Sequence, residues 1–407
     1  MQPLPHRDRR APRIPLRSRA SVASMLLAGV SLIAGCASAP PYDAAQLVAQ
    51  RFRDMPPQDE VVATAEWYRP RMRVAGAPAS RHEPAPAATF ASALEVARSY
   101  DSLAVVVMID GRIALEYYAP GIDAKTRFDT QSMHRGVLAL AVLAALEDGK
   151  IRSLEQPLAD FFPEWRAAGD ARGRITLSDL LHGQSGLADP PYEFRADSPG
   201  MQLFIGGDLR ALALAQRPVA APGKVFRGNA LDSQLLGLVL EQATRESYAK
   251  FLSRRLWRPL GADDAWVRLD REGGNTRTFC CLQADARDWA KVGELVRTRG
   301  APQGRRVLRE SSIERLLAPA PLNAGVGMNW FLQPTALVPR SVAGDRPLPT
   351  PTAFASRGVV YAGGRGGQRV YVLPNERAVV VRIGRIRNDF DDGKFLNPFI
   401  AALSAPR

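Results

Sequence analysis

The feature that most constrains the fold of this sequence is an unbroken apolar run from Gly136 to Leu146. It lies in the stretch FDTQSMHRGVLALAVLAALEDGK, residues 128–150. A helix that is apolar all round has to be buried, and Gly149 is a typical C-terminal cap. The run therefore predicts a helix at the centre of a domain. Ser132 stands at its start and Arg135 follows three residues later, on the same face.

The rest of the chain predicts a sheet domain interrupted by helices. With 407 residues and 46% hydrophobic composition, the chain can bury a large core. Hairpins are predicted around Asp110-Gly111 and Pro374-Asn375, and helical spacing dominates between them. Strands near both ends with helices between predict an α/β sheet domain from 89–175 and 311–407, and an inserted helical domain at 176–310.

The N-terminus has the pattern of a targeting signal. A basic stretch ends at Arg19, and an apolar run from Val22 to Ala34 is followed by GC. This run is too short to span a bilayer, so residues 1–36 are predicted to be a signal peptide. Residues 37–88 contain many Pro and Ala residues with weak periodicity, which predicts a flexible tether.

Charge and cysteine content exclude several classes of function. The net charge is +13, but six arginines of the signal account for much of it, and the remainder, +8, is scattered along the chain. This distribution argues against a nucleic-acid partner. Adjacent cysteines rarely pair, so Cys280 and Cys281 are predicted to be buried small residues without a disulfide. The four histidines are far apart in sequence, and neither a metal site nor a cofactor is predicted.

The order of motifs resembles the serine β-lactamase and penicillin-binding-protein superfamily. A DGR hairpin, a Ser-Met-x-x helix, DFFPEW, ITLSDLLHGQSGL, LLGLVLEQAT, GMNWF and GGQRVYVLP follow one another over roughly residues 90–405. The resemblance is greatest to the branch of class C β-lactamases, related esterases and nylon-oligomer hydrolases. It implies an α+β, β-lactamase-like fold, in which an antiparallel sheet is flanked by helices and carries an inserted all-helical domain.

By the same kind of resemblance, LIAGC is similar to a bacterial lipobox. This implies that Cys36 carries the lipid anchor and that the protein is attached to a membrane of the cell envelope. Ala37 is not the aspartate associated with inner-membrane retention, so the outer membrane, facing the periplasm, is expected. An ordinary cleaved secretory signal with an incidental cysteine is the alternative.

The family's nucleophile is the serine of Ser-x-x-Lys, and Ser132 matches it by position. A serine hydroxyl is a poor nucleophile until a base removes its proton. Arg135 stands where the family has its lysine, and a guanidinium stays charged and only donates hydrogen bonds. Arg135 therefore cannot be the base, but it can position Ser132, lower the serine pKa or bind a substrate carboxylate.

The two other family motifs are also incomplete. The Tyr-x-Asn positions fall on Gly228, Asn229 and Ala230, so the tyrosine is missing; a slip of one residue brings Asn229 into the asparagine's place. No Lys-Thr-Gly precedes GGQRVYV. Gly364 or Arg365 is predicted to supply the second oxyanion donor, although these glycines can instead serve only a tight turn.

Two aromatic residues, Tyr192 and Trp330, match regions that contribute to the family's cleft. An aromatic side chain in a protein of this size is more often part of the core. Three functions are compatible with these residues: a hydrolase that acylates Ser132 with an amide, ester or peptide substrate, a non-catalytic protein that binds a ligand in the cleft, and a structural lipoprotein. The sequence does not predict the oligomeric state.

Overall fold

A computed structural model describes residues 43–57, 60–78, 90–167, 169–334 and 350–405. The predicted signal peptide and its Cys36 lie outside the described residues. Within the described ranges, no helix is both long and apolar enough to cross a membrane.

The centre of the sheet domain is a five-stranded antiparallel sheet of order β3-β2-β9-β8-β7. Its strands are β2 (Ser102–Ile109), β3 (Arg112–Tyr118), β7 (Val360–Gly364), β8 (Gln368–Leu373) and β9 (Ala378–Gly384). Asp110 and Gly111 join β2 to β3 with φ of 50° and 76°, as a two-residue hairpin turn requires. Both predicted hairpins, β2–β3 and β8–β9, are confirmed.

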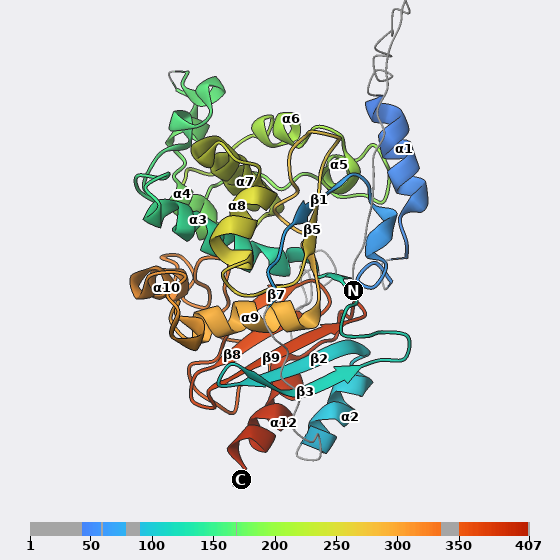
Figure 1. Cartoon of the computed structure of the whole chain (residues 1–407). Helices are drawn as coiled ribbons and strands as arrows, with labels where there is room; N and C mark the ends of the chain where they lie inside the picture. The colour runs from blue at the N-terminus through green and yellow to red at the C-terminus, as the bar shows by residue number, and fades with distance from the viewer. Residues whose placement is uncertain (1–42, 58–59, 79–89, 168, 335–349, 406–407) are drawn as a thin grey trace, which may run out of the picture. The chain divides into compact units, whose positions relative to one another are not determined.

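Helices cover both faces of this sheet. Figure 1 shows α9 (Ala286–Arg297) on one face and the pair α2 (Ala91–Ser99) and α12 (Asp392–Ser404) on the other. Side chains alternate along each strand. In β2, Val105 and Val107 belong to the core under α2 and α12, whereas Val106 and Met108 belong to the larger core. The predicted fold class is confirmed.

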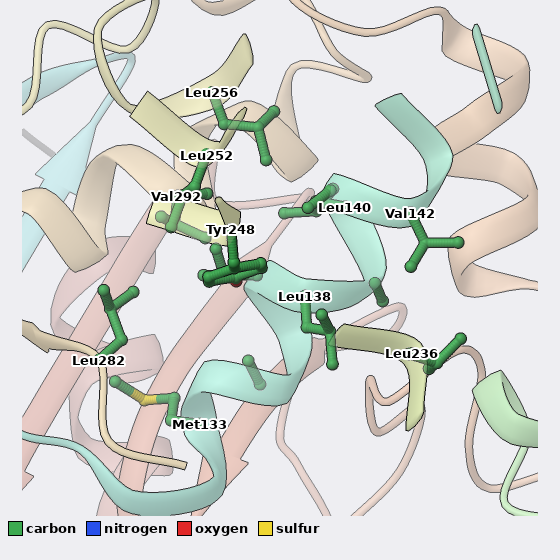
Figure 2. Packing of buried hydrophobic residues seen from close by; sticks show 14 of the residues in the cluster. Met133, Leu138, Leu140, Val142, Leu236, Tyr248, Leu252, Leu256, Leu282 and Val292 are labelled. Atoms are coloured by element: carbon green, nitrogen blue, oxygen red, sulfur yellow. The ribbon is translucent and has the colours of Figure 1, made fainter. Parts of the chain in front are cut away.

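The larger core is built around α3 (His134–Glu147), which is entered through a 3-10 turn, η3 (Gln131–Met133). All residues of α3 from Gly136 to Ala145 are buried, and α3 packs against α7 (Ala230–Thr244). Figure 2 shows side chains of α3 pointing in several directions into this core. The predicted central helix is confirmed. Further α-helices in the described residues are α4 (Leu177–Leu181), α5 (Pro199–Ile205), α6 (Leu209–Leu214), α8 (Tyr248–Leu252) and α10 (Glu310–Leu317).

The structure differs from the sequence analysis in residues 37–88, where a tether was predicted. This range contains α1 (Ala44–Asp54) and β1 (Arg71–Val74). The buried Arg51 anchors α1 by donating to the carbonyl oxygens of Arg69 and Ile205 at 3.0 and 2.8 Å. Strand β1 pairs with β5 (Ala265–Arg268), so backbone hydrogen bonds hold a segment whose composition gives little sign of order.

The region 176–310 is also less uniformly helical than predicted. It contributes β5 and β6 (Gln283–Ala284) to a small sheet of order β1-β5-β6-β4, in which β4 is Phe128–Asp129. Helix α9 lies on the large sheet, in contact with β2, β8 and β9. The boundary between the sheet part and the helical part therefore falls before α9 rather than at residue 310.

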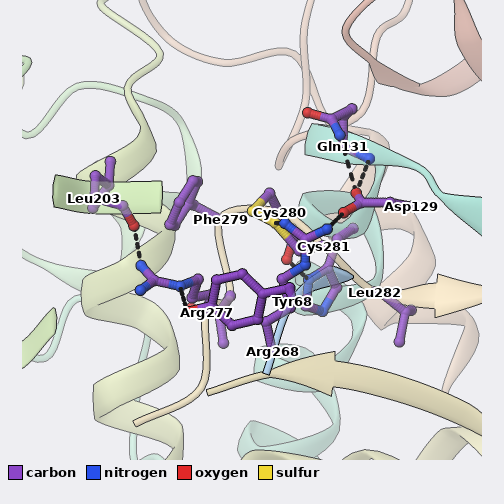
Figure 3. Close-up of a disulfide and its surroundings, with 12 residues drawn as sticks. Tyr68, Asp129, Gln131, Leu203, Arg268, Arg277, Phe279, Cys280, Cys281 and Leu282 are labelled. Carbon is purple, nitrogen blue, oxygen red and sulfur yellow. Dashed lines mark hydrogen bonds and ion pairs between the residues drawn. A yellow bond between two sulfur atoms is a disulfide. The ribbon is translucent and has the colours of Figure 1, made fainter. Parts of the chain in front are cut away.

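Cys280 and Cys281 form a disulfide, so the prediction that they remain unpaired is wrong. Cys281 has a left-handed backbone with φ of 77°, and this turn brings the two sulfur atoms together. Both cysteines are buried, as predicted. Figure 3 shows the disulfide near Arg268 and Asp129.

Candidate active site

One cavity of about 290 Å³ contains the predicted nucleophile. Ser132, Arg135 and Trp330 line it, together with His182 and Asn329, for which the sequence analysis proposed no catalytic or binding role. The indole Nε1 of the buried Trp330 donates to the carbonyl oxygen of Gly136, at 3.3 Å. The structure thus brings together three of the predicted site residues and adds two polar side chains.

Ser132 lies in η3, immediately before α3. No residue in the described part of the chain forms a hydrogen bond with its hydroxyl group. The end of β7 approaches closely: a Cβ on Gly364 would overlap the carbonyl oxygen of Thr130 and lie 3.0 Å from the nitrogen of Met133. Gly364 therefore lies beside the turn that carries Ser132, residues 130–133, called the nucleophile turn below. The predicted second oxyanion donor has to lie there. That role stays a prediction.

Arg135 brings a positive charge into the cavity. Its Nε donates to the carbonyl oxygen of Phe279 at 3.1 Å, and burial lowers its pKa while Asp232 and Asp189 raise it. Burial raises the pKa of Asp232 to about 8, against the opposing effects of Ser185, Asn229 and Arg135. Burial likewise raises the pKa of Asp189, the other carboxyl group near Arg135, so both carboxyl groups favour their neutral forms more than exposed ones do, and this weakens their pairing with Arg135. The cavity is suited to a substrate carboxylate or an oxyanion.

His182 is a proton acceptor that faces the same cavity. Its Nδ1 lies 2.9 Å from the carbonyl oxygen of Ser178, and a carbonyl only accepts, so Nδ1 carries the proton and Nε2 is free of one. Burial lowers the pKa of His182 below 6.5, although the bond to Ser178 raises it in part. The ring is therefore neutral at pH 7 and can take up a proton on Nε2.

His134 has a different environment, although it is two residues from Ser132. Its two ring nitrogens are 2.6 Å from the carbonyl oxygen of Cys280 and 2.7 Å from the hydroxyl of Tyr248. Burial lowers its pKa to about 4. The ring is fully buried and does not line the cavity, so His134 is a packed residue and not a base for Ser132.

Asn329 offers an unused hydrogen-bond donor. Within the described chain, its Nδ2 is buried and has no hydrogen-bond partner, and its backbone is left-handed with φ of 59°. An unpaired buried amide costs about 1–3 kcal/mol, and such groups in native proteins call for an explanation. A ligand in the cavity that accepts a hydrogen bond from Asn329 would remove this cost.

The remaining predicted site residues lie elsewhere. Asn229 is the N-cap of α7, where its side chain accepts from the backbone N–H of Asp232 at 2.7 Å, and it does not line the cavity. Gly228 does line it, and a Cβ there would meet nothing within 4 Å, so the place of the family's tyrosine is open space. Tyr192 and Arg365 line a second cavity. Among the described residues, no group of three His, Cys, Asp or Glu side chains could hold a metal ion.

Comparison with known proteins extends over most of the chain. The family model described as Beta-lactamase matches residues 59–404. The 6-aminohexanoate-dimer hydrolase of Paenarthrobacter ureafaciens is 26% identical over 230 residues, which cover 53% of this chain and 57% of that relative. The chain thus spans little more than half the length of this curated relative.

Solved structures resemble the fold over a larger share of the chain. A Bacillus anthracis protein provisionally described as a 6-aminohexanoate-dimer hydrolase superposes with a TM-score of 0.67 and 19% identity, covering 84% of this chain and 91% of that one. A family VIII carboxylesterase superposes with a TM-score of 0.57 and 16% identity, covering 80% and 99%. At these identities the likeness concerns the fold.

Proposed function

Because this chain belongs to the beta-lactamase family, we propose that it is a serine hydrolase that forms an acyl-enzyme at Ser132 with an amide or ester substrate. The observation that carries the proposal is the shared cavity: Ser132, the neutral imidazole of His182 and the cation of Arg135 all face it. The names of relatives, a 6-aminohexanoate-dimer hydrolase and a carboxylesterase, support amide or ester chemistry.

In the proposed reaction, the Oγ of Ser132 bonds to the substrate carbonyl carbon and its proton passes to Nε2 of His182. The hydroxyl has no hydrogen bond to His182 in the structure, so the proton moves through a water molecule or after a side-chain rotation. The N–H of Ser132, at the positive end of α3, stabilises the oxyanion. The tetrahedral intermediate then breaks its bond to the leaving group, which takes the proton from His182.

Hydrolysis of the acyl-enzyme repeats these steps with water. The water oxygen bonds to the acyl carbon, its proton passes to His182, and the bond to Oγ breaks as the proton returns to Ser132. The free acid leaves. Arg135 and the amide of Asn329 bind polar groups of the acyl or leaving part of the substrate.

Labelling of the purified protein with a fluorophosphonate, a reagent that reacts with activated serines, tests this proposal. We expect a covalent adduct on Ser132, mapped by peptide mass spectrometry, and its complete loss in Ser132→Ala. Arg135→Lys is a second probe, because a lysine that loses its proton restores the family's base and should increase labelling. A folded wild-type protein that remains unlabelled would contradict the proposal.

A second candidate function follows from Gly228, which leaves the site without the family's tyrosine. In this alternative the cleft binds a cell-envelope ligand without cleaving it. The same labelling experiment separates the two, because only the hydrolase forms an adduct.

We further propose that the protein is a lipoprotein of the outer membrane, facing the periplasm and anchored through Cys36. The lipobox-like LIAGC supports the anchor. The Cys280–Cys281 disulfide supports an oxidising compartment. Because one acyl chain gives only weak membrane binding and several give stable binding, Cys36→Ala should move the protein from the membrane fraction to the soluble fraction. Immunoblotting of both fractions measures this, and unchanged membrane association would rule out Cys36 as the anchor.

A further inference from the structure

A second cavity, of about 190 Å³, lies next to the one that holds Ser132. Residues that are close in sequence line the two cavities. Gln131 lines the second cavity and Ser132 the first; Arg365 lines the second and Gly363 the first. Between them, Gly364 packs against Thr130 in the nucleophile turn. Because Gln131 and Ser132 are adjacent in the chain, the two cavities lie on either side of this short stretch of backbone and of its contact with Gly364.

The lining of the second cavity is mainly aromatic and sulfur-containing. Its walls include Met55 and Trp67 from the segment after α1, Met201 and Phe204 from α5, and Cys281 of the disulfide. Figure 3 shows Gln131 beside Asp129, with Arg268 and the disulfide next to them. Since the segment after α1 precedes most of the family's motifs, this wall depends on a part of the chain outside them.

Arg268 adds no net charge to this wall. Its guanidinium forms a buried ion pair with Asp129 and lies 4.8 Å from the ring centroids of both Trp67 and Tyr68. Because the ion pair is neutral overall and two aromatic rings cover the cation, the inner wall favours an uncharged apolar group.

Two aromatic side chains stay exposed at this cavity. Tyr192 is 50% exposed and Phe194 62% exposed, and both line it. Tyr192 belongs to a chain of ring contacts: it meets Phe204 edge-on at 6.1 Å, and Phe204 meets Phe279 edge-on at 5.2 Å. Phe194 instead meets Phe52, at 5.3 Å. A further ring inserted beside Tyr192 would extend this packing and cover surface that the fold leaves in water.

The volume of the second cavity limits the size of the chemical group that it can bind. A buried apolar cavity of about 150 Å³ in another protein binds benzene, so a cavity of about 190 Å³ accommodates one six-membered ring with a small substituent. The two cavities differ in chemistry: the first contains the cation of Arg135 and the amide of Asn329, whereas the lining of the second is mostly apolar and aromatic, with the exposed Arg365 among it.

We propose that the second cavity binds a phenyl-sized aromatic ring of the substrate. The substrate is then an ester or amide that joins this ring to a polar or anionic part, which occupies the Ser132 cavity. The assignment of the ring to a substrate rests on the proposed function, whereas binding of the ring does not require turnover.

Binding of 4-methylphenol to the Ser132→Ala protein, measured by isothermal titration calorimetry, tests the proposal without catalysis. We expect saturable binding that weakens about fivefold to tenfold in Tyr192→Ala and in Phe194→Ala, because each removes one aromatic contact. Leu322→Ala is the matched control: Leu322 is 42% exposed and lines neither cavity, so affinity should be unchanged.

Val61→Trp, which fills the cavity from its wall, should abolish binding. If this variant does not fold, the double variant of Tyr192 and Phe194 replaces it, since both side chains are exposed. Unchanged affinity in the folded cavity variants overturns the proposal, as does the absence of binding. Ring binding without fluorophosphonate labelling of the wild type would overturn the hydrolase function alone, and labelling without ring binding would overturn the aromatic cavity alone.

Discussion

Replacing His182 by asparagine is expected to slow acylation of Ser132 by about 10²- to 10⁴-fold, the usual contribution of a general base. His182 is the neutral imidazole that lines the Ser132 cavity with an unprotonated Nε2. Asparagine has a similar size and keeps a donor toward Ser178, but it cannot accept a proton. The measurement is the rate of fluorophosphonate labelling at pH 7.5.

The pH profile provides a second readout that a purely structural role would not change. Since burial lowers the pKa of His182 below 6.5, the imidazole is mostly neutral at pH 7. Its protonation as the pH falls through the lowered pKa should reduce acylation. His182→Asn should lose this acidic limb, whereas Lys224→Ala, which removes an exposed lysine of the loop before Gly228, should keep both rate and profile. A wild-type labelling rate in His182→Asn would exclude His182 as the base.

The fold could be predicted where side-chain patterns alone determine structure. The apolar run of α3 has only one stable environment, and Asp110-Gly111 accepts the positive φ that its turn needs. Order in α1 and β1 depends instead on distant partners, such as the carbonyl oxygen of Ile205 for Arg51. No local pattern in the sequence reveals these contacts.

The candidate site likewise contains residues that a local sequence pattern places together and residues that only the folded chain brings together. Ser132 and Arg135 are three residues apart where η3 leads into α3, so the sequence places them together. His182 and Asn329 reach that cavity through tertiary packing, which no local pattern in the sequence reveals. Asn229 is the opposite case. It matches a position of the family's second motif, but in the structure it caps α7, a role that Asn commonly has.

Replacing Asp392 by alanine is expected to destabilise the protein by about 3–5 kcal/mol, because it leaves a buried charge without its partner. The Oδ1 of Asp392 accepts from Nε of Arg369 and from the hydroxyl of Tyr371, each at 2.6 Å. Both side chains of the ion pair are at most 2% exposed. Urea denaturation measures the change. The control is Glu310→Ala, which breaks an exposed ion pair with Arg299 and should change the stability far less, because exposed ion pairs contribute little.

Asp392→Ala should also slow the reaction at Ser132. Arg369 donates from Nη1 to the carbonyl oxygen of Gly364, at 2.9 Å, and Gly364 packs against Thr130 in the nucleophile turn. Without Asp392, Arg369 has no counter-charge to fix it, so the end of β7 loses a support on the side of Ser132. We therefore expect folded Asp392→Ala protein to label at Ser132 more slowly than wild type, while Glu310→Ala labels at the wild-type rate.

Replacing both partners, with Arg369→Met and Asp392→Leu, should recover much of the stability but not the labelling rate, because the bond to Gly364 is still absent. Recovery of both would show that the ion pair acts on Ser132 only through global stability.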